Sequence, residues 1–414
     1  MSRSLTTSAF LGNFFEHYDT ALFSFLSPFL APLIFPEKDP LTALILTYAL
    51  IPLGMLARPF GSLVFGYIGD NYGRKKALVF TFSGMSIVSF MIAFSPTYAS
   101  AGLLAPLIFC IGRILQNFCA AGESVGGAIF LLENHTTRRH DFLSSLYSAS
   151  TIGGILAASL SVSWLYYSNF LQPGWRLLYL FGGLMTLIVC FMRSMQENNN
   201  FLTKKQEPYN LLEVINLYKF KLLLIMISTG FSYANYCMAL ILMNGLIPLI
   251  TPYSSEKMMG MNTALLALDF IALPFFGWLS DKIGREKLML GSCLAIILTS
   301  LPLFLFLKGA SLVTIIGIRI LFVLFGVAFA APLHAWLQQL LPPYCRYVII
   351  SLGYALGSQL FGGPTVALSL WVFQKTGSLL SIPIYWISLA LVCFIVLFLH
   401  FVKRGATQKT VYSQ

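Results

Sequence analysis

GYIGDNYGRKK, at residues 66–76, recurs as GWLSDKIGREK at residues 277–287. Asp70 therefore matches Asp281, which stands about half of the 414-residue chain further on. Each copy ends one long apolar segment and precedes another. A membrane chain that repeats itself near its midpoint is typical of transporters built from two related helix bundles.

The composition indicates an integral membrane protein. The chain is 57% hydrophobic and 10% charged, and its mean hydropathy is +0.79, whereas soluble domains carry about 25% charged residues. A helix needs about 20 apolar residues to cross a bilayer. About twelve segments meet this length, near 9–34, 43–69, 77–96, 102–133, 142–167, 175–195, 221–250, 259–280, 288–308, 311–341, 347–374 and 378–402. We predict an all-α membrane protein with twelve transmembrane helices in two pseudo-symmetric six-helix bundles.

The one sizeable polar stretch, 196–220, separates six apolar segments from six. It predicts an N-terminal bundle at 1–195, a cytoplasmic linker at 196–220, a C-terminal bundle at 221–402 and a short cytoplasmic tail at 403–414. Most of the 26 Lys and Arg residues, with Arg193 among them, fall in loops on the side of the two termini. This bias predicts a plasma (bacterial inner) membrane protein with both termini cytoplasmic, and it accounts for the net charge of +11 without a nucleic-acid partner.

Three carboxylates stand within the predicted spans at similar depth. Glu16 and Asp19 share one face of the first span, and Glu123 lies at a matching depth in the fourth, which runs the other way. Ionisable groups inside a membrane are costly and point to function. Crowded carboxylates in a low dielectric cannot all ionise cheaply, so we expect one of them to carry the coupling proton. The alternative is that they only pair with Arg58 and Arg113.

The arginines within the spans suit a carboxylate of the substrate or of the protein. Arg113 presents five donors in a fork, and Asn117 lies on its side of the helix, so both are candidates for substrate binding. Arg319 is the positional echo of Arg113 in the second half. Arg58 precedes a proline at which a helix kinks, which favours a structural role. Asp269 is isolated from other polar residues, and its role stays open.

Three tyrosines are candidates for lining a central cavity. They are Tyr18 in the first span, with Tyr233 and Tyr236 in the seventh. Their rings suit a quaternary ammonium group through cation–π attraction. The alternative is that they only pack in the core.

Four stretches carry a resemblance to the major facilitator superfamily: GNFFEHYD at 12–19, RPFG at 58–61, GDNYGRKK at 69–76 and RILQNFCAAGE at 113–123. More narrowly, the chain is similar to the metabolite–proton symporter branch, whose members transport proline/betaine, 2-oxoglutarate, citrate or shikimate. The resemblance implies alternating access, with the repeated loop latching the inner side shut.

The residues of that gating motif are Gly66, Asp70, Gly73 and Arg74 in the first copy, with Asp281, Gly284 and Arg285 in the second. Asp70 ends its span where its carboxylate can meet the positive N-terminus of a neighbouring helix. The alternative is a plain topogenic charge cluster, but the spacing preserved in the second copy favours the latch.

These observations predict a secondary transporter that couples a proton to a small polar metabolite. Zwitterions such as proline or betaine come first, because four acids against three arginines in the spans lean that way, and a 2-oxoglutarate-like dicarboxylate comes second. A drug–proton exporter is disfavoured, since the fifth span has Gly153-Gly154 but lacks that class's glycine-proline signature. A non-transporting nutrient sensor or a channel is a further alternative.

The sequence motifs of enzymes and of metal-binding proteins are absent from this chain. The sequence shows no nucleophile–base pair and no cluster of metal ligands, so we expect neither an enzyme nor a bound metal or cofactor. The expected partners are the metabolite, a proton and the lipid bilayer, and the protein is expected to be monomeric.

Overall fold

The computed structural model describes residues 3–35, 40–135, 139–195 and 209–412, and the predicted linker at 196–220 therefore lies largely outside the described residues. Within the described part the chain forms helices and turns and no strand. Ten of these helices are long and apolar enough to cross a membrane. The two other predicted spans are also helical, as α1 (Arg3–Ile34) and as α16 (Arg346–Gly357) with α17 (Thr365–Thr376). This arrangement confirms the predicted all-α membrane fold.

The chain divides into two compact units, each with segments from both halves of the sequence. Unit 1 comprises Met1–Thr136, Ser150–Leu217 and Leu341–Leu352. Unit 2 comprises Thr137–Ala149, Tyr218–Leu340 and Gly353–Gln414. The bundles at 1–195 and 221–402 stay a prediction, because each unit also takes a short segment from the other half.

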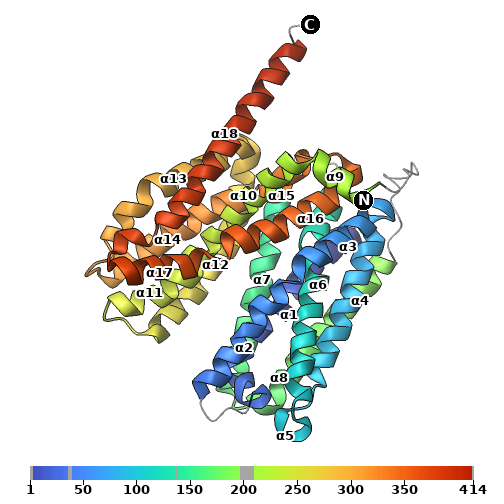
Figure 1. The fold of residues 1–414 in the computed structure, drawn as a ribbon, viewed down its shortest axis with the longest axis vertical. Helices are drawn as coiled ribbons and strands as arrows, with labels where there is room; N and C mark the ends of the chain where they lie inside the picture. Colours follow the sequence, from blue (N-terminus) through green and yellow to red (C-terminus); the bar gives the residue numbers. More distant parts are fainter. Residues whose placement is uncertain (1–2, 36–39, 136–138, 196–208, 413–414) are drawn as a thin grey trace. The chain divides into compact units, whose positions relative to one another are not determined.

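Unit 1 is built around helices that pack along one another. α4 lies beside α8, and α6 contacts α1, α3 and α4 (Figure 1). The helices of this unit, besides α1 and the start of α16, are α2 (Pro40–Met55), α3 (Arg58–Asn71), α4 (Arg74–Ala93), α5 (Tyr98–Ala101), α6 (Leu104–Glu133), most of α7 (His140–Tyr167), α8 (Leu171–Ser194), α9 (Leu211–Leu217) and the 3₁₀ turn η2 (Pro343–Cys345).

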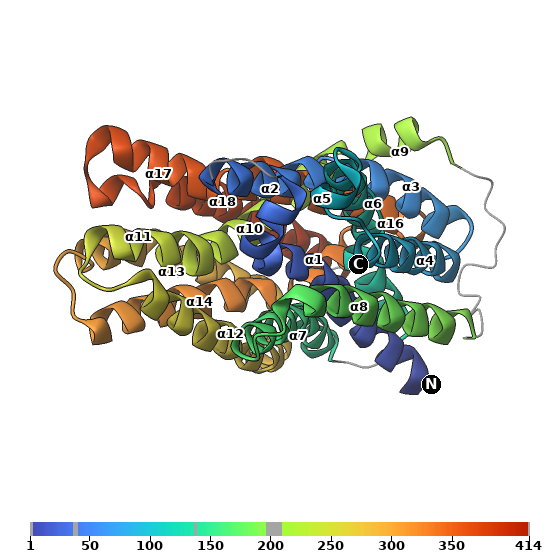
Figure 2. The same cartoon turned by 90° about the horizontal axis from the view of Figure 1, so that it is seen from below.

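Unit 2 contains two π-helical turns, η1 (Cys237–Leu242) and η3 (Ser358–Gly362), a conformation found frequently at functional sites. α13 packs against both α14 and α18 (Figure 2). The remaining elements are α10 (Lys219–Tyr236), α11 (Met243–Ile250), α12 (Ser255–Ile283), α13 (Arg285–Leu305), α14 (Leu312–Ala330), α15 (Leu333–Gln339), α17, η4 (Leu379–Ser381) and α18 (Ile384–Tyr412).

The repeated loop explains how consecutive helices turn. Gly73, between α3 and α4, has φ +106°, and Gly284, between α12 and α13, has φ +97°. A side chain at either position would meet nothing within 4 Å, so glycine is required by the backbone conformation rather than by space. The break before α3 also follows the sequence, since α2 ends at Met55 and α3 begins at Arg58 with a proline in its first turn.

Candidate functional site

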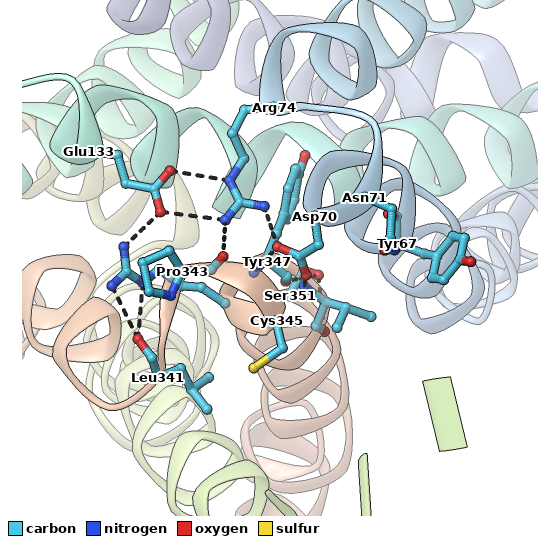
Figure 3. A network of polar contacts seen from close by, with 12 residues as sticks. Tyr67, Asp70, Asn71, Arg74, Glu133, Leu341, Pro343, Cys345, Tyr347 and Ser351 are labelled. Carbon is cyan, nitrogen blue, oxygen red and sulfur yellow. Dashed lines mark hydrogen bonds and ion pairs between the residues drawn. The ribbon is translucent and has the colours of Figure 1, made fainter. Parts of the chain in front are cut away.

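The first copy of the repeated loop holds a buried aspartate against the start of another helix. Asp70 lies in the last turn of α3, and its carboxylate accepts backbone N–H bonds from Tyr347 at 3.1 Å and Val348 at 2.9 Å (Figure 3). Both donors belong to the first turn of α16, whose unpaired N–H groups and partial positive charge attract an anion. The expected contact between Asp70 and a neighbouring helix N-terminus is confirmed.

Arg74, the first residue of α4, joins Asp70 to a second carboxylate. Its guanidinium pairs with Asp70, its Nε donates to Glu133 at 3.2 Å, and it also donates to the Pro343 carbonyl at 2.7 Å (Figure 3). Arg346, at the start of α16, donates to the same Glu133 at 2.7 Å. We call Asp70, Arg74, Glu133 and Arg346 the charge cluster. Asp70 and Arg74 are buried, whereas Glu133 and Arg346 are partly exposed.

Gly66 lets α3 approach α16 closely. A Cβ at this position would lie 2.5 Å from the Cα of Val348, closer than carbon atoms can pack. Glycine at the start of the motif therefore serves packing, whereas Gly73 at its end serves the turn.

The described part of the predicted linker, which begins at residue 209, also reaches the charge cluster. The Tyr209 hydroxyl donates to Oδ2 of Asp70 at 3.1 Å. Its ring lies edge-on to Tyr67 of α3 and to Tyr344 of η2, with centroid separations of 5.6 and 6.4 Å. Tyr209 was not predicted as a site residue, and the signal that could have indicated it was an aromatic residue in a polar stretch.

The second copy of the loop repeats the same geometry within unit 2. Asp281 accepts backbone N–H bonds from Asp141 and Phe142, each at 3.1 Å, in the first turn of α7. Arg285 pairs with the Asp141 carboxylate at 2.9 Å, and Ser280 donates to that carboxylate at 2.7 Å. Each motif aspartate thus caps a helix N-terminus, but the motif arginine pairs with the motif aspartate in the first copy only.

The three carboxylates predicted to crowd together are buried, but each has its own partners. Asp19 accepts from Ser89 at 2.6 Å and from Gln116 at 2.5 Å, through its Oδ2. Glu16 accepts from Ser124 at 2.9 Å. Among the described residues, the other oxygens of Asp19 and Glu16 have no hydrogen-bond donor.

Glu123 differs, because it forms a buried ion pair with Arg193. The guanidinium nitrogens Nη1 and Nη2 each lie 2.8 Å from a carboxylate oxygen, and the guanidinium carbon lies over the Phe82 ring, 4.7 Å from its centroid. The sequence assigned Arg193 to an inner loop and considered Arg58 and Arg113 as partners of the acids. That assignment was wrong because α8 continues to Ser194 and turns the Arg193 side chain inward, where it is 1% exposed.

Arg113 is 2% exposed and makes no ion pair with any carboxylate of the described chain. Its Nη1 donates to the Gln116 side chain at 2.5 Å, its guanidinium lies 4.5 Å from the Phe23 ring centroid, and its Nε has no acceptor. Arg58 instead donates to Asn117 at 3.0 Å. Arg113 is therefore a buried guanidinium whose charge is paired with no carboxylate of the described chain.

Arg319 in unit 2 stands at the sequence position that corresponds to Arg113. Arg319 is fully buried; it donates to Asn262 at 2.7 Å, and its Nε and Nη1 find no acceptor among the described residues. Asp269 is 9% exposed and takes part in no ion pair of the described chain. Tyr233 and Tyr236 stack on each other, with ring centroids 6.3 Å apart.

Tyr18 lies in the hydrophobic core of unit 1. It is 2% exposed, and its ring packs edge-on against Phe15 and Phe181. This ring is therefore in contact with core residues.

Within the described ranges, no three His, Cys, Asp or Glu side chains gather as metal ligands would.

Comparisons with known proteins place these features in context. Residues 9–358 match the sequence model of the Major Facilitator Superfamily. A citrate-proton symporter from Salmonella typhi is 31% identical over 95% of this chain and 93% of its own length. A protein from Staphylococcus aureus (strain MSSA476), named "Putative proline/betaine transporter", is 28% identical over 97% of this chain and 89% of its own length.

Solved structures share the fold at low sequence identity. The proton:xylose symporter XylE, bound to 6-bromo-6-deoxy-D-glucose, superposes with a TM-score of 0.79 at 16% identity, over 95% of this chain and 94% of that one. The human organic anion transporter MFSD10 gives a TM-score of 0.69 at 13% identity, over 95% of this chain and 99% of that one. At such identities the likeness concerns the fold alone.

Proposed function

Because the chain belongs to the major facilitator superfamily, we propose that it is a proton-coupled symporter of a small carboxylate metabolite, with a citrate-like anion as the first candidate. The observation that carries this proposal is Arg113, a buried guanidinium without a carboxylate partner in the described chain. A substrate carboxylate would supply the missing acceptor through the paired donors of the guanidinium. The relative named as a citrate-proton symporter supports the same class of substrate.

Asp19 and Glu16 are the better candidates for the coupling proton. Both are buried, and neither has an arginine or lysine within ion-pair distance in the described chain; Glu16 has the His17 ring 3.5 Å from its Oε2. A carboxylate in a low dielectric without a cationic partner favours the protonated form. Glu123 is held by Arg193 on both oxygens, which favours a structural role for that acid.

Proline or betaine, which the sequence analysis put first, becomes the second candidate substrate class, because Arg113 has no carboxylate partner in the described chain. The oxygens of Asp19 and Glu16 that lack donors could receive a cationic group, and a relative carries this name. The aromatic residues support a quaternary ammonium less well. The Tyr18 ring is packed in the core, and the Phe23 ring already faces the guanidinium of Arg113.

The gating role of the repeated loop is part of the proposal. We propose that capping of α16 by Asp70 holds the inner side closed and that this contact must break when the inner side opens. Its counterpart is the capping of α7 by Asp281. The residues assigned to this motif are Gly66, Asp70, Gly73, Arg74, Asp281, Gly284 and Arg285.

We also propose a plasma-membrane location with both termini inside and a monomeric state. The distribution of Lys and Arg supports this orientation. Asn210, an exposed residue of the predicted linker, provides the test. In a variant without the seven native cysteines, Asn210→Cys should react with an impermeant thiol reagent only after cells are permeabilised, and reaction in intact cells would contradict the proposed orientation.

Uptake by proteoliposomes tests the proposed function. The purified protein should accumulate labelled citrate against its gradient when the outside is acidic, and a protonophore should abolish the accumulation. Labelled proline and betaine, offered in parallel, would identify the second substrate class. Arg113→Lys should weaken citrate binding because it loses the bidentate fork. A sensor would move none of these compounds, a channel would not concentrate them, and an exporter would expel them.

A further inference from the structure

We propose that Gln116 is an amide switch which releases the Nη1 donor of Arg113 to the substrate only when Asp19 carries a proton on the oxygen that faces the amide. The inference rests on the proposed function, in which Asp19 takes the proton and Arg113 binds the substrate carboxylate. Gln116 is in this sense a positioning residue, because it acts through its two neighbours.

The geometry puts one neutral amide between two opposite charges. Arg113 Nη1 lies 2.5 Å from Oε1 of Gln116, and Nε2 of Gln116 lies 2.5 Å from Oδ2 of Asp19. All three side chains are at least 98% buried. The amide therefore takes the place of a direct ion pair between the arginine of α6 and the aspartate of α1.

The chemistry of the two neighbours fixes the orientation of the amide. Arginine only donates, so the amide must present its oxygen to Arg113, and an ionised carboxylate only accepts, so the amide must present its NH₂ to Asp19. Both conditions hold together as long as Oδ2 of Asp19, the oxygen that faces the amide, carries no proton. In that state one guanidinium donor is occupied by the protein.

Protonation of Asp19 on Oδ2 reverses one of these conditions. The new O–H needs an acceptor, and rotation of the amide brings Oε1 of Gln116 to it. The same rotation turns the NH₂ group toward Arg113, where two donors face each other and cannot bond. Ser89 loses nothing, because its hydroxyl also lies 3.0 Å from the Met85 carbonyl. Nη1 of Arg113 is then free for a substrate carboxylate, and deprotonation of Asp19 restores the first arrangement.

Few other charged or titratable side chains lie near Asp19. Arg113 of α6 is the charged residue that faces Asp19 from another helix of the described chain, and Tyr179 of α8 is the titratable residue that interacts with both. α4 contributes the Ser89 hydroxyl, and Gly182 of α8 brings no side chain to Oδ1 of Asp19. On α1 itself, Glu16 lies one turn before Asp19 and Tyr18 precedes it directly.

Linkage makes the effect measurable in both directions. If the proton on Asp19 strengthens citrate binding, bound citrate must strengthen proton binding by the same factor, typically about 5- to 150-fold. Purified wild-type protein should take up protons as it binds citrate, at pH values where citrate is fully ionised. Gln116→Leu should bind citrate with an affinity that no longer depends on pH. Gln116→Glu should do the same, because its carboxylate holds Arg113 whether or not Asp19 is protonated.

Ser86→Ala is the matched control. Ser86 is a buried serine of α4, one turn before Ser89, and it donates to the Gly183 carbonyl rather than to a charged group. This variant should keep the wild-type pH dependence. Equal pH dependence in wild type, Gln116→Leu and Gln116→Glu would overturn the switch while leaving proton-coupled citrate transport intact.

A second readout needs no substrate. Infrared difference spectra between alkaline and acidic pH should show a shift of a glutamine side-chain carbonyl band in the wild type. That shift should be absent from Gln116→Leu and from Asp19→Asn. If wild-type protein fails to bind citrate, the proposed substrate is wrong, but the infrared band still shows whether the Gln116 amide changes its hydrogen bonding with pH. A spectrum without the band shift overturns the switch whatever the substrate.

Discussion

Replacing Asp70 by Asn should weaken the contact between α3 and the first turn of α16. The carboxylate accepts two backbone N–H bonds and pairs with Arg74. Hydrogen bonds to charged groups contribute about 1.5–3 kcal/mol and neutral ones about 0.5–1.5, so the two bonds lose roughly 2 kcal/mol together. The lost charge at the helix N-terminus adds up to about 2 kcal/mol. Arg74 keeps Glu133 as a partner.

The total of about 2–4 kcal/mol corresponds to a shift of about 30- to 700-fold in the equilibrium between the capped and released positions of α16. A reporter cysteine at Ser351 measures this shift, because Ser351 is 1% exposed and donates to the Ser62 carbonyl of α3. In a variant without the native cysteines, Ser351→Cys should react with a hydrophilic maleimide much faster when Asp70→Asn is present.

Two controls accompany this measurement. Asn71→Ala changes the next residue, which bonds the Tyr67 carbonyl within its own helix, and should leave the labelling rate unchanged. The second control concerns transport rather than labelling. Asp281→Asn should slow transport less than Asp70→Asn, because Arg285 pairs with Asp141 in the second copy and keeps this partner.

An unchanged labelling rate of Ser351→Cys in Asp70→Asn would refute the reasoning that Asp70 holds α16 in place.

Three further predictions follow from individual contacts. Glu123→Gln leaves the buried Arg193 without its carboxylate and should lower the free energy of unfolding by about 3–5 kcal/mol, measured by denaturation in detergent; an unchanged midpoint would contradict the buried pair. Gly73→Ala should destabilise by about 1–2 kcal/mol because alanine must adopt a positive φ, whereas Gly291→Ala, inside α13 and equally open, should stabilise by about 0.5–1 kcal/mol. Asp19→Asn should exchange internal for external citrate yet fail to accumulate it, and wild-type accumulation would move the proton site elsewhere.

The sequence was sufficient for features that depend on local patterning. Apolar length and the repeated loop predicted the membrane fold, and the matched positions of Gly73 and Gly284 follow from the turn that each copy needs. The contact of Asp70 with a helix N-terminus was also predictable, because an acid at the end of a span has few other partners. These inferences use spacing and charge, which a single sequence contains.

Pairings across helices could not be read in the same way. The partner of Glu123 depends on where α8 ends and which way Arg193 turns, and neither is encoded in the spacing of charges. The bridge through Gln116 depends on the depth of α1 relative to α6. The contact of Tyr209 with Asp70 joins residues far apart in the sequence. In each case the missing information is the rotation and depth of one helix against another.

Proton movement driven by substrate tests the central claim most directly. Proteoliposomes loaded with a pH-sensitive dye, without an imposed pH gradient, should acidify inside when citrate is added outside, and Arg113→Lys should need more citrate for the same rate. Asp19→Asn should abolish the acidification while still exchanging labelled citrate. Entry of citrate into wild-type vesicles without internal acidification would contradict proton-coupled symport.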